Sequence, residues 1–144
     1  MPMIDVYAVR GTFPDPHRVA ADAAAIVMAV EQVPDIALFR ENTCAFVHEL
    51  GPNGMADVDG SNRHVRVQVL TNAGALDRDK QLAVVSRLTD LVVESSGEPS
   101  LRERTWVLLT EAPDGGWGLF GHAYLNGELV QEARRQLAHD EPAR

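Results

Sequence analysis

The sequence repeats one pattern of strand, helix and strand at a spacing of 62 residues. Asp15 and Asp77, which lie at that spacing, each stand where a helical stretch begins. A repeat limits the possible folds more than any single motif, because each copy must form the same supersecondary unit. We therefore predict one domain over the 144 residues, with tandem units over 2–62 and 64–124 and a C-terminal helix and tail over 126–144.

Each unit carries the local signals of its elements. In the first unit, apolar residues alternate over 3–9 and predict a strand. Asp15 is a favourable N-cap and Pro16 suits the first helical turn, so we expect a helix that runs to about Gln32. The apolar stretch over 43–50 predicts the second strand.

The second unit repeats these signals. Alternation over 64–70 predicts its first strand, Asp77 caps its helix, Gly97 ends that helix, and 106–109 is its second strand. The helical spacing predicts a buried stripe made of Leu82, Val85, Leu88 and Val92.

Together the two units predict an α/β fold, in which a four-stranded mixed sheet has both long helices on one face. A C-terminal helix that begins at Asn126 follows them. The other face of the sheet is left without a cover, which favours association through that face or through the sheet edges.

Composition excludes several functional classes. Apolar residues make up 45% and the net charge is −8, so we expect a globular protein that binds neither nucleic acid nor an anionic membrane. The first residues lack a basic region followed by an apolar run and a cleavage site, so we expect no signal peptide, and no apolar run is long enough to cross a bilayer. The only cysteine, Cys44, allows no internal disulfide, which fits the cytoplasm. The histidines and Cys44 lack metal-ligand spacing, so no metal is expected.

Pro2 is the strongest catalytic candidate in the sequence. Its small size permits removal of Met1, which would make it the N-terminal residue with a secondary amine. Burial in an apolar pocket disfavours the charged form of an amine, and an amine with a pKa near neutrality can act as a general base and then as a general acid. The alternative interpretation is that Pro2 has no catalytic role, as in many proteins with proline at this position.

These features resemble the tautomerase superfamily, typified by 4-oxalocrotonate tautomerase. The resemblance is carried by Pro2 at the head of the first strand with Gly11 after it, by the helix start over 77–80, and by the strand over 104–111 followed by the loop over 116–118. The doubled length is similar to that of members with two units in one chain, such as cis-3-chloroacrylic acid dehalogenase, malonate semialdehyde decarboxylase and macrophage migration inhibitory factor.

The resemblance implies a cofactor-independent tautomerase, an isomerase that acts on a small enol or keto acid with Pro2 as the general acid and base. It also implies a homotrimer. Trp117 matches an aromatic residue that walls the family's pocket, although it can equally be a packing residue in a glycine-rich loop. His122, just after this loop, is a further candidate for substrate binding.

The family's substrate-binding arginines are missing from their usual positions. Thr12 stands after the glycine of the first strand, and Asn72, a donor without charge, stands after the third strand. Arg40 is the best remaining cation for a substrate carboxylate, or else a solvated loop charge. Two alternatives therefore stay open: lyase, hydratase or dehalogenase-type chemistry from the same proline, and a non-catalytic ligand-binding protein on the same scaffold.

Overall fold

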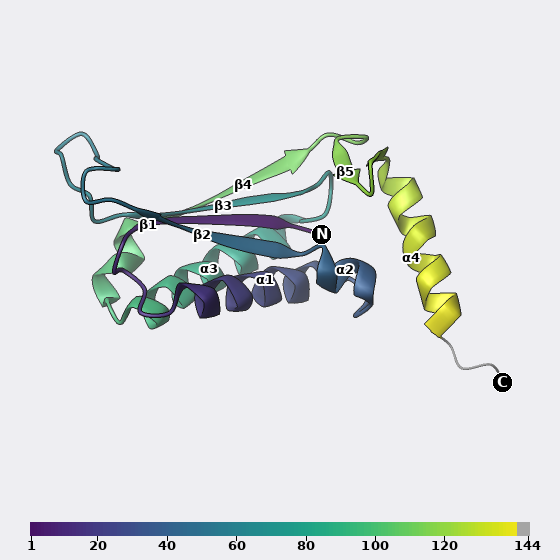
Figure 1. Ribbon diagram of the computed structural model, residues 1–144, viewed down its shortest axis with the longest axis horizontal. Coiled ribbons are helices and arrows are strands. Elements are labelled where there is room, and N and C mark those ends of the chain that lie inside the picture. The colour runs from purple at the N-terminus through teal and green to yellow at the C-terminus, as the bar shows by residue number, and fades with distance from the viewer. Residues whose placement is uncertain (141–144) are drawn as a thin grey trace.

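The computed structural model describes residues 1–140 and confirms the predicted α/β architecture, with a four-stranded mixed sheet, helices on one face and a C-terminal helix (Figure 1). The elements in chain order are β1 (Met3–Val9), α1 (Pro16–Glu31), α2 (Ala37–Glu41), β2 (Cys44–Leu50), β3 (Val65–Asn72), α3 (Arg78–Ser96), the 3₁₀ helix η1 (Pro99–Arg104), β4 (Thr105–Ala112), β5 (Trp117–Leu119), β6 (His122–Tyr124) and α4 (Asn126–Asp140).

The strand order of the main sheet is β2-β1-β3-β4. β1 pairs parallel with β2, and β3 pairs parallel with β4, whereas the two central strands, β1 and β3, are antiparallel. Each parallel pair is joined by one long helix, as a parallel connection requires. Because the central strands are antiparallel, the two units begin at opposite ends of the sheet.

One face of the sheet carries the core. α1 and α3 lie side by side beneath this face (Figure 1). The core-facing residues of the two central strands are fully buried: Ile4, Val6 and Ala8 in β1, and Val65, Val67 and Val69 in β3. The opposite face remains open, as the sequence predicts, and it exposes large apolar side chains, namely Phe46, Trp106 and Leu108.

Both long helices begin at the predicted caps. The Asp15 carboxylate accepts a hydrogen bond from the Arg18 backbone N–H at 3.0 Å, and Asp77 accepts one from the Lys80 N–H at 2.9 Å. Each satisfies a backbone donor that the first helical turn leaves without a partner. Gly97 ends α3 in the left-handed conformation with φ of 68°, which glycine adopts without steric cost.

The expected repeat spacing of 62 residues is wrong for the first strand of each unit, β1 and β3, and for the long helices α1 and α3. At that spacing buried Ile4 falls on Arg66, which is exposed. A spacing of 61 residues instead places Ile4 on buried Val65. An odd change of register exchanges the two faces of a strand, so burial distinguishes the two spacings sharply.

The same one-residue difference corrects the predicted stripe of α3. Leu82 and Val85 are exposed, whereas Val84 and Leu91 are buried beside Leu88 and Val92. The buried positions of α3 therefore follow those of α1 at 61 residues, as in the pairs Ala23 with Val84 and Val27 with Leu88.

Several short elements were not predicted. α2 has only five residues, and β5 pairs with β6 in a two-stranded sheet apart from the main one. α4 projects from the end of the molecule beyond the N-terminus (Figure 1). The tail over 141–144 lies outside the described residues. Among the described helices, none is long and apolar enough to cross a membrane.

Candidate functional site

The N-terminus lies at the edge of a pocket of about 500 Å³. Met1 lines this pocket and is itself 3% exposed, while Pro2 behind it is fully buried. The Pro2 carbonyl accepts a hydrogen bond from the Cys44 backbone N–H at 3.2 Å, which ties the start of β1 to β2. The structure therefore places the predicted catalytic residue directly beneath Met1, so that removal of Met1 would bring its nitrogen to the pocket.

The polar centre of the pocket is an ion pair between Met1 and Glu31. The Met1 ammonium lies 3.2 Å from Glu31 Oε2, and both side chains are almost completely buried. Burial raises the pKa of the Glu31 carboxyl, although the adjacent ammonium opposes this shift. Burial likewise lowers the pKa of the Met1 amine, against the opposing charge of Glu31. Burial therefore shifts the pKa of each group toward its uncharged form, because desolvation penalises charge.

The end of α1 holds Glu31 in this position. Lys80 Nζ donates a hydrogen bond at 3.0 Å to the backbone carbonyl of Glu31, which links the end of α1 to the first turn of α3. Gln32 ends the helix in the left-handed conformation with φ of 60°, and Pro34 follows shortly after. The helix therefore stops where the glutamate side chain can reach the N-terminus.

Asn72, at the end of β3, also lines the pocket. Its Nδ2 is buried and has no hydrogen-bond partner among the described residues. The neighbouring loop is held by Asn126, whose Nδ2 donates to the Ala73 carbonyl at 3.0 Å. A buried donor without a partner is costly, and a ligand oxygen in the pocket would satisfy it.

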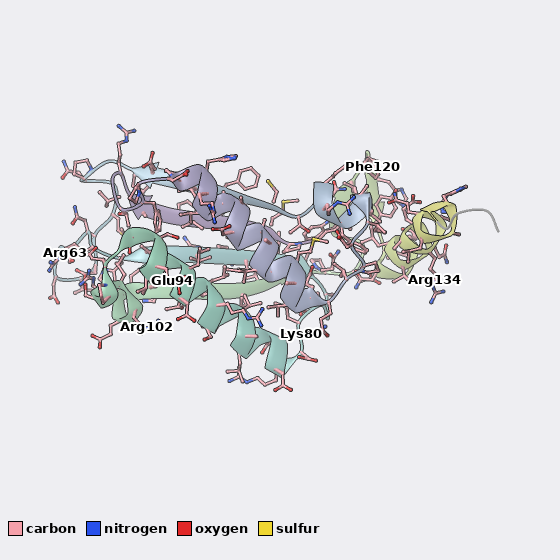
Figure 2. The ribbon with its side chains drawn as sticks, turned by 90° about the horizontal axis from the view of Figure 1, so that it is seen from below. Arg63, Lys80, Glu94, Arg102, Phe120 and Arg134 are labelled. Atoms are coloured by element: carbon pink, nitrogen blue, oxygen red, sulfur yellow. The ribbon has the colours of Figure 1, made fainter. Side chains whose placement is uncertain are left out.

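Apolar side chains form most of the remaining walls. They come from the segment after α1, from α2 and from α4: Val33, Pro34, Phe39, Leu129, Val130, Ala133 and Leu137. Arg134 of α4 is the cation in the lining and is exposed, and Figure 2 shows its side chain on α4 at one end of the molecule. The pocket thus combines an apolar body with a carboxyl, an amine and an amide donor.

Trp117 does not line the pocket. It lies in β5 and is buried in a cluster that also contains Met1, Leu38 and Leu129. Its role in this structure is to pack beneath the N-terminus and α4, which corresponds to the structural alternative for this residue.

The structure brings neither Arg40 nor His122 to the N-terminal pocket. Arg40 pairs with Asp35 at 2.8 Å and lines a separate cavity against α1. His122 Nε2 lies 3.1 Å from Glu128 Oε2 on the exposed surface of the β5–β6 hairpin. Hydrogen bonds from the Leu125 N–H and from His122 lower the pKa of the Glu128 carboxyl.

Glu31 is one of the polar lining residues, with Arg134, that sequence reasoning did not single out. It ends an amphipathic helix, where a glutamate normally faces solvent. Its partner is 30 residues away along the chain, so no local pattern connects the two. The sequence signal that could have found it is its spacing from Val27. Positions i and i+4 share one helix face, and Val27 belongs to the buried stripe, so Glu31 is expected on the buried face as well.

Comparison with protein families identifies the second unit. Residues 64–124 match the family model described as Tautomerase enzyme. The second unit therefore resembles the tautomerase family in sequence. This match confirms the predicted resemblance in the second unit, and solved structures confirm the fold over most of the chain. No curated protein matches the chain in sequence.

Solved structures of this superfamily share the fold over most of the chain. The structure of Pt0534 inactivated by 2-oxo-3-pentynoate has a TM-score of 0.72 at 15% identity and covers 88% of this chain and 98% of its own. A symmetric trimer of fused 4-OT has a TM-score of 0.68 at 18% identity, and the match covers 83% of this chain and 93% of the 4-OT chain. Malonate semialdehyde decarboxylase has a TM-score of 0.65 at 17% identity, and the match covers 90% of this chain and 98% of the decarboxylase chain.

Among residues 1–140, no group of three or more His, Cys, Asp or Glu side chains is arranged to hold a metal ion. The chemistry that the described groups themselves can supply is proton transfer, because an amine and a carboxyl of shifted pKa lie together in a largely apolar pocket.

Proposed function

We propose that this protein is a cofactor-independent tautomerase, in which Pro2 becomes the N-terminal residue after Met1 is removed. The Pro2 amine then takes a proton from one carbon of an enol or keto acid and returns it to another. The observation that carries the proposal is the position of the N-terminus, buried at the edge of a largely apolar pocket of about 500 Å³. Such burial keeps part of an amine unprotonated near neutral pH, as a general base requires.

Asn72 supports this proposal through its unpartnered Nδ2, which can donate a hydrogen bond to the oxygen of an enolate. Donors aimed at developing negative charge supply a large share of the catalysis in such sites. Arg134, at the rim of the pocket, is the cation available for a substrate carboxylate. In the proposal Pro2 is the acid and base, Asn72 holds the carbonyl oxygen, and the apolar walls hold the carbon skeleton.

The first experiment tests the base. Untagged protein whose intact mass lacks Met1 is assayed for ketonisation of phenylenolpyruvate, alongside Pro2→Ala. Alanine is also small, so Met1 is still removed from this variant. We expect the variant to lose roughly 10²- to 10⁴-fold in turnover, the range for a lost acid-base group. Pro14→Ala, in an exposed loop, is the matched control and keeps full turnover. Equal turnover of Pro2→Ala and wild type would contradict the proposal.

A second experiment does not depend on the substrate. Since 2-oxo-3-pentynoate inactivates Pt0534, the same compound is incubated with the processed protein. An unprotonated proline nitrogen would add to the alkyne carbon, with a proton moving to the adjacent carbon, so the whole reagent mass is retained. We expect the adduct on the N-terminal peptide of the wild type. A sample that retains Met1 is the control and carries no adduct on Pro2.

One observation favours each alternative to tautomerase chemistry. The Glu31 carboxyl could activate a water molecule in the pocket, which favours a hydratase, lyase or dehalogenase-type reaction. Among the described residues, no buried lysine or arginine side chain lines the pocket, which favours a non-catalytic ligand-binding protein. A processed protein that binds 2-oxo acids without converting them would identify the last alternative.

We further propose that the protein is a cytoplasmic homotrimer that associates through the open face of the sheet. Phe46, Trp106 and Leu108 supply the exposed apolar area on that face, and the fused 4-OT relative is a trimer. Phe46→Glu should convert the assembly to monomers in light scattering, whereas Val58→Glu, in an exposed loop, should leave its mass unchanged. An unchanged mass for Phe46→Glu would place the contact elsewhere.

A further inference from the structure

A second pocket, of about 280 Å³, lies where the other unit begins. Its walls come from the end of β1, the segment before β3 and the connection between α3 and β4. Figure 2 shows Arg63, which lines this pocket, at the end of the molecule opposite to Arg134 of the first pocket. The two pockets therefore occupy the two ends of the sheet.

The two pockets are built from corresponding segments of the two units. Met1 and Pro2 directly precede β1, as Arg63 and His64 directly precede β3. The loop after β3 closes the first pocket, and the end of β1 with its following loop closes the second. This correspondence follows from the antiparallel pairing of β1 with β3, which relates the units by an approximate two-fold rotation.

The second pocket differs from the first in its charge. Arg10 and Arg63 both line it, and neither side chain forms an ion pair within the part of the chain that the structure describes. The carboxylate in its wall, Glu98, is already bound by Arg104 at 3.4 Å, and Arg104 Nε also donates to the Arg63 carbonyl at 2.7 Å. Two guanidinium groups are therefore available in a chain whose net charge is −8.

His64 also lines this pocket. Its ring stacks on Trp106, with centroids 4.5 Å apart and an angle of 3° between the planes. Its Nδ1 is buried, makes no hydrogen bond among the described residues, and lies 3.6 Å from Asp57 Oδ2. The other oxygen of Asp57 accepts the backbone N–H groups of Asp59 and Ser61, which fixes the loop that carries it.

We propose that this second pocket binds a small organic carboxylate. The planar guanidinium groups of Arg10 and Arg63 match the geometry of a carboxylate, which arginine binds through paired hydrogen bonds. Val9, Val65 and Leu101 provide an apolar surface for the carbon part of the ligand. The volume suits a molecule of a few carbon atoms, below the range of drug-sized pockets.

Malonate is the probe for this site. It is titrated into the protein at constant ionic strength, with chloride as the compensating anion, and the His64 imidazole is followed by NMR. Loss of one signal in His64→Gln assigns the resonance among the five histidines. We expect a saturable shift of the His64 signal in the wild type. Arg10→Gln and Arg63→Gln should each weaken binding by about tenfold, as for one lost charge-assisted hydrogen bond.

Arg18→Gln and Arg102→Gln are the matched controls, because they remove the same charge from exposed ion pairs elsewhere. Neither should change the affinity for malonate. A shift that chloride reproduces, or one weakened equally by the control variants, would overturn the proposal by showing only general screening. Inorganic phosphate that binds as tightly as malonate would overturn the assignment to carboxylates. Both arginine side chains are exposed, so the variants are expected to fold.

Discussion

The Met1 ammonium and the Glu31 carboxylate lie 3.2 Å apart in the interior of the protein, and each has a pKa shifted toward its uncharged form. Desolvation is the largest cause of both shifts, so it outweighs the attraction between the two charges. A buried ion pair of this kind positions the N-terminus but adds little to the free energy of unfolding, since the cost of burying the charges offsets their attraction.

The first prediction concerns pH. Because the folded-state pKa of Glu31 lies above 4.5, the folded state binds more protons there than the unfolded state, and its contribution to stability is lost as pH rises above this value. The lowered pKa of the amine acts oppositely, with stability gained as pH rises toward 8.0. Glu31→Gln removes the first effect and, by removing the carboxylate, lowers the pKa of the amine further.

The wild type should therefore lose stability relative to Glu31→Gln as pH rises above about 4.5. Urea unfolding of both proteins with Met1 retained, measured across this range, gives the difference. Glu94→Gln, on the exposed side of α3, is the control and should follow the wild-type curve closely. A difference that stays constant with pH would show that Glu31 has an ordinary pKa in the folded state.

The second prediction tests which face of α3 is buried. Leu88 is 1% exposed and Leu82 is 53% exposed, although both belong to the stripe that helical spacing predicts. Leu88→Ala should lower the free energy of unfolding by about 2–5 kcal/mol, since it removes buried methyl groups and leaves a cavity. Leu82→Ala should cost less than about 0.5 kcal/mol. Equal losses in urea unfolding would refute the register.

The third prediction concerns the end of α3. Gly97 has φ of 68° and no atom within 4 Å of an added Cβ, so the cost of alanine there is conformational and not steric crowding. Gly97→Ala should lower the free energy of unfolding by about 1 kcal/mol, because a side chain disfavours the left-handed region. Gly51→Ala, which also meets no atom within 4 Å but has no positive φ, should be neutral. A neutral Gly97→Ala would mean that α3 ends differently.

The fourth prediction separates the role of Asn72 in activity from its role in stability. Its buried Nδ2 has no partner, so Asn72→Leu should keep or raise the free energy of unfolding. If the side chain holds the substrate oxygen, as proposed, the same variant should lose about 10²- to 10³-fold in kcat. Asn53→Leu, in an exposed loop, is the control for both measurements. An active Asn72→Leu would remove this residue from the proposed mechanism.

The sequence was sufficient for the long helices and the four strands of the main sheet, but not for the short elements or for the exact register. Asp15 and Asp77 mark the helix starts because capping is a local interaction. The stripe of α3 was misplaced because the repeat spacing is 61 residues there and 62 at the caps, a difference that only burial reveals. α2 was missed because five residues are too few to show helical periodicity.

The sequence pointed to some of the residues around the N-terminal pocket and missed others. Asn72 was singled out and lines the N-terminal pocket, and Pro2 was singled out and directly follows Met1, which lines it. Each stands at the end of a central strand that the alternation pattern predicts. Arg40 was chosen for its charge, and the structure pairs it with Asp35 instead. Glu31 was missed because its contact with the N-terminus spans 30 residues and depends on tertiary packing.

A polypeptide has one free amine at its start, so two equivalent units in one chain cannot both have it. The unit that begins at His64 enters its strand through an ordinary peptide bond, and whatever its pocket does must come from side chains. Joining two copies end to end therefore makes their sites chemically different at once, before any substitution occurs. Covalent connectivity alone gives the chain-terminal amine to one pocket and leaves the other to its side chains, which here include Arg10 and Arg63.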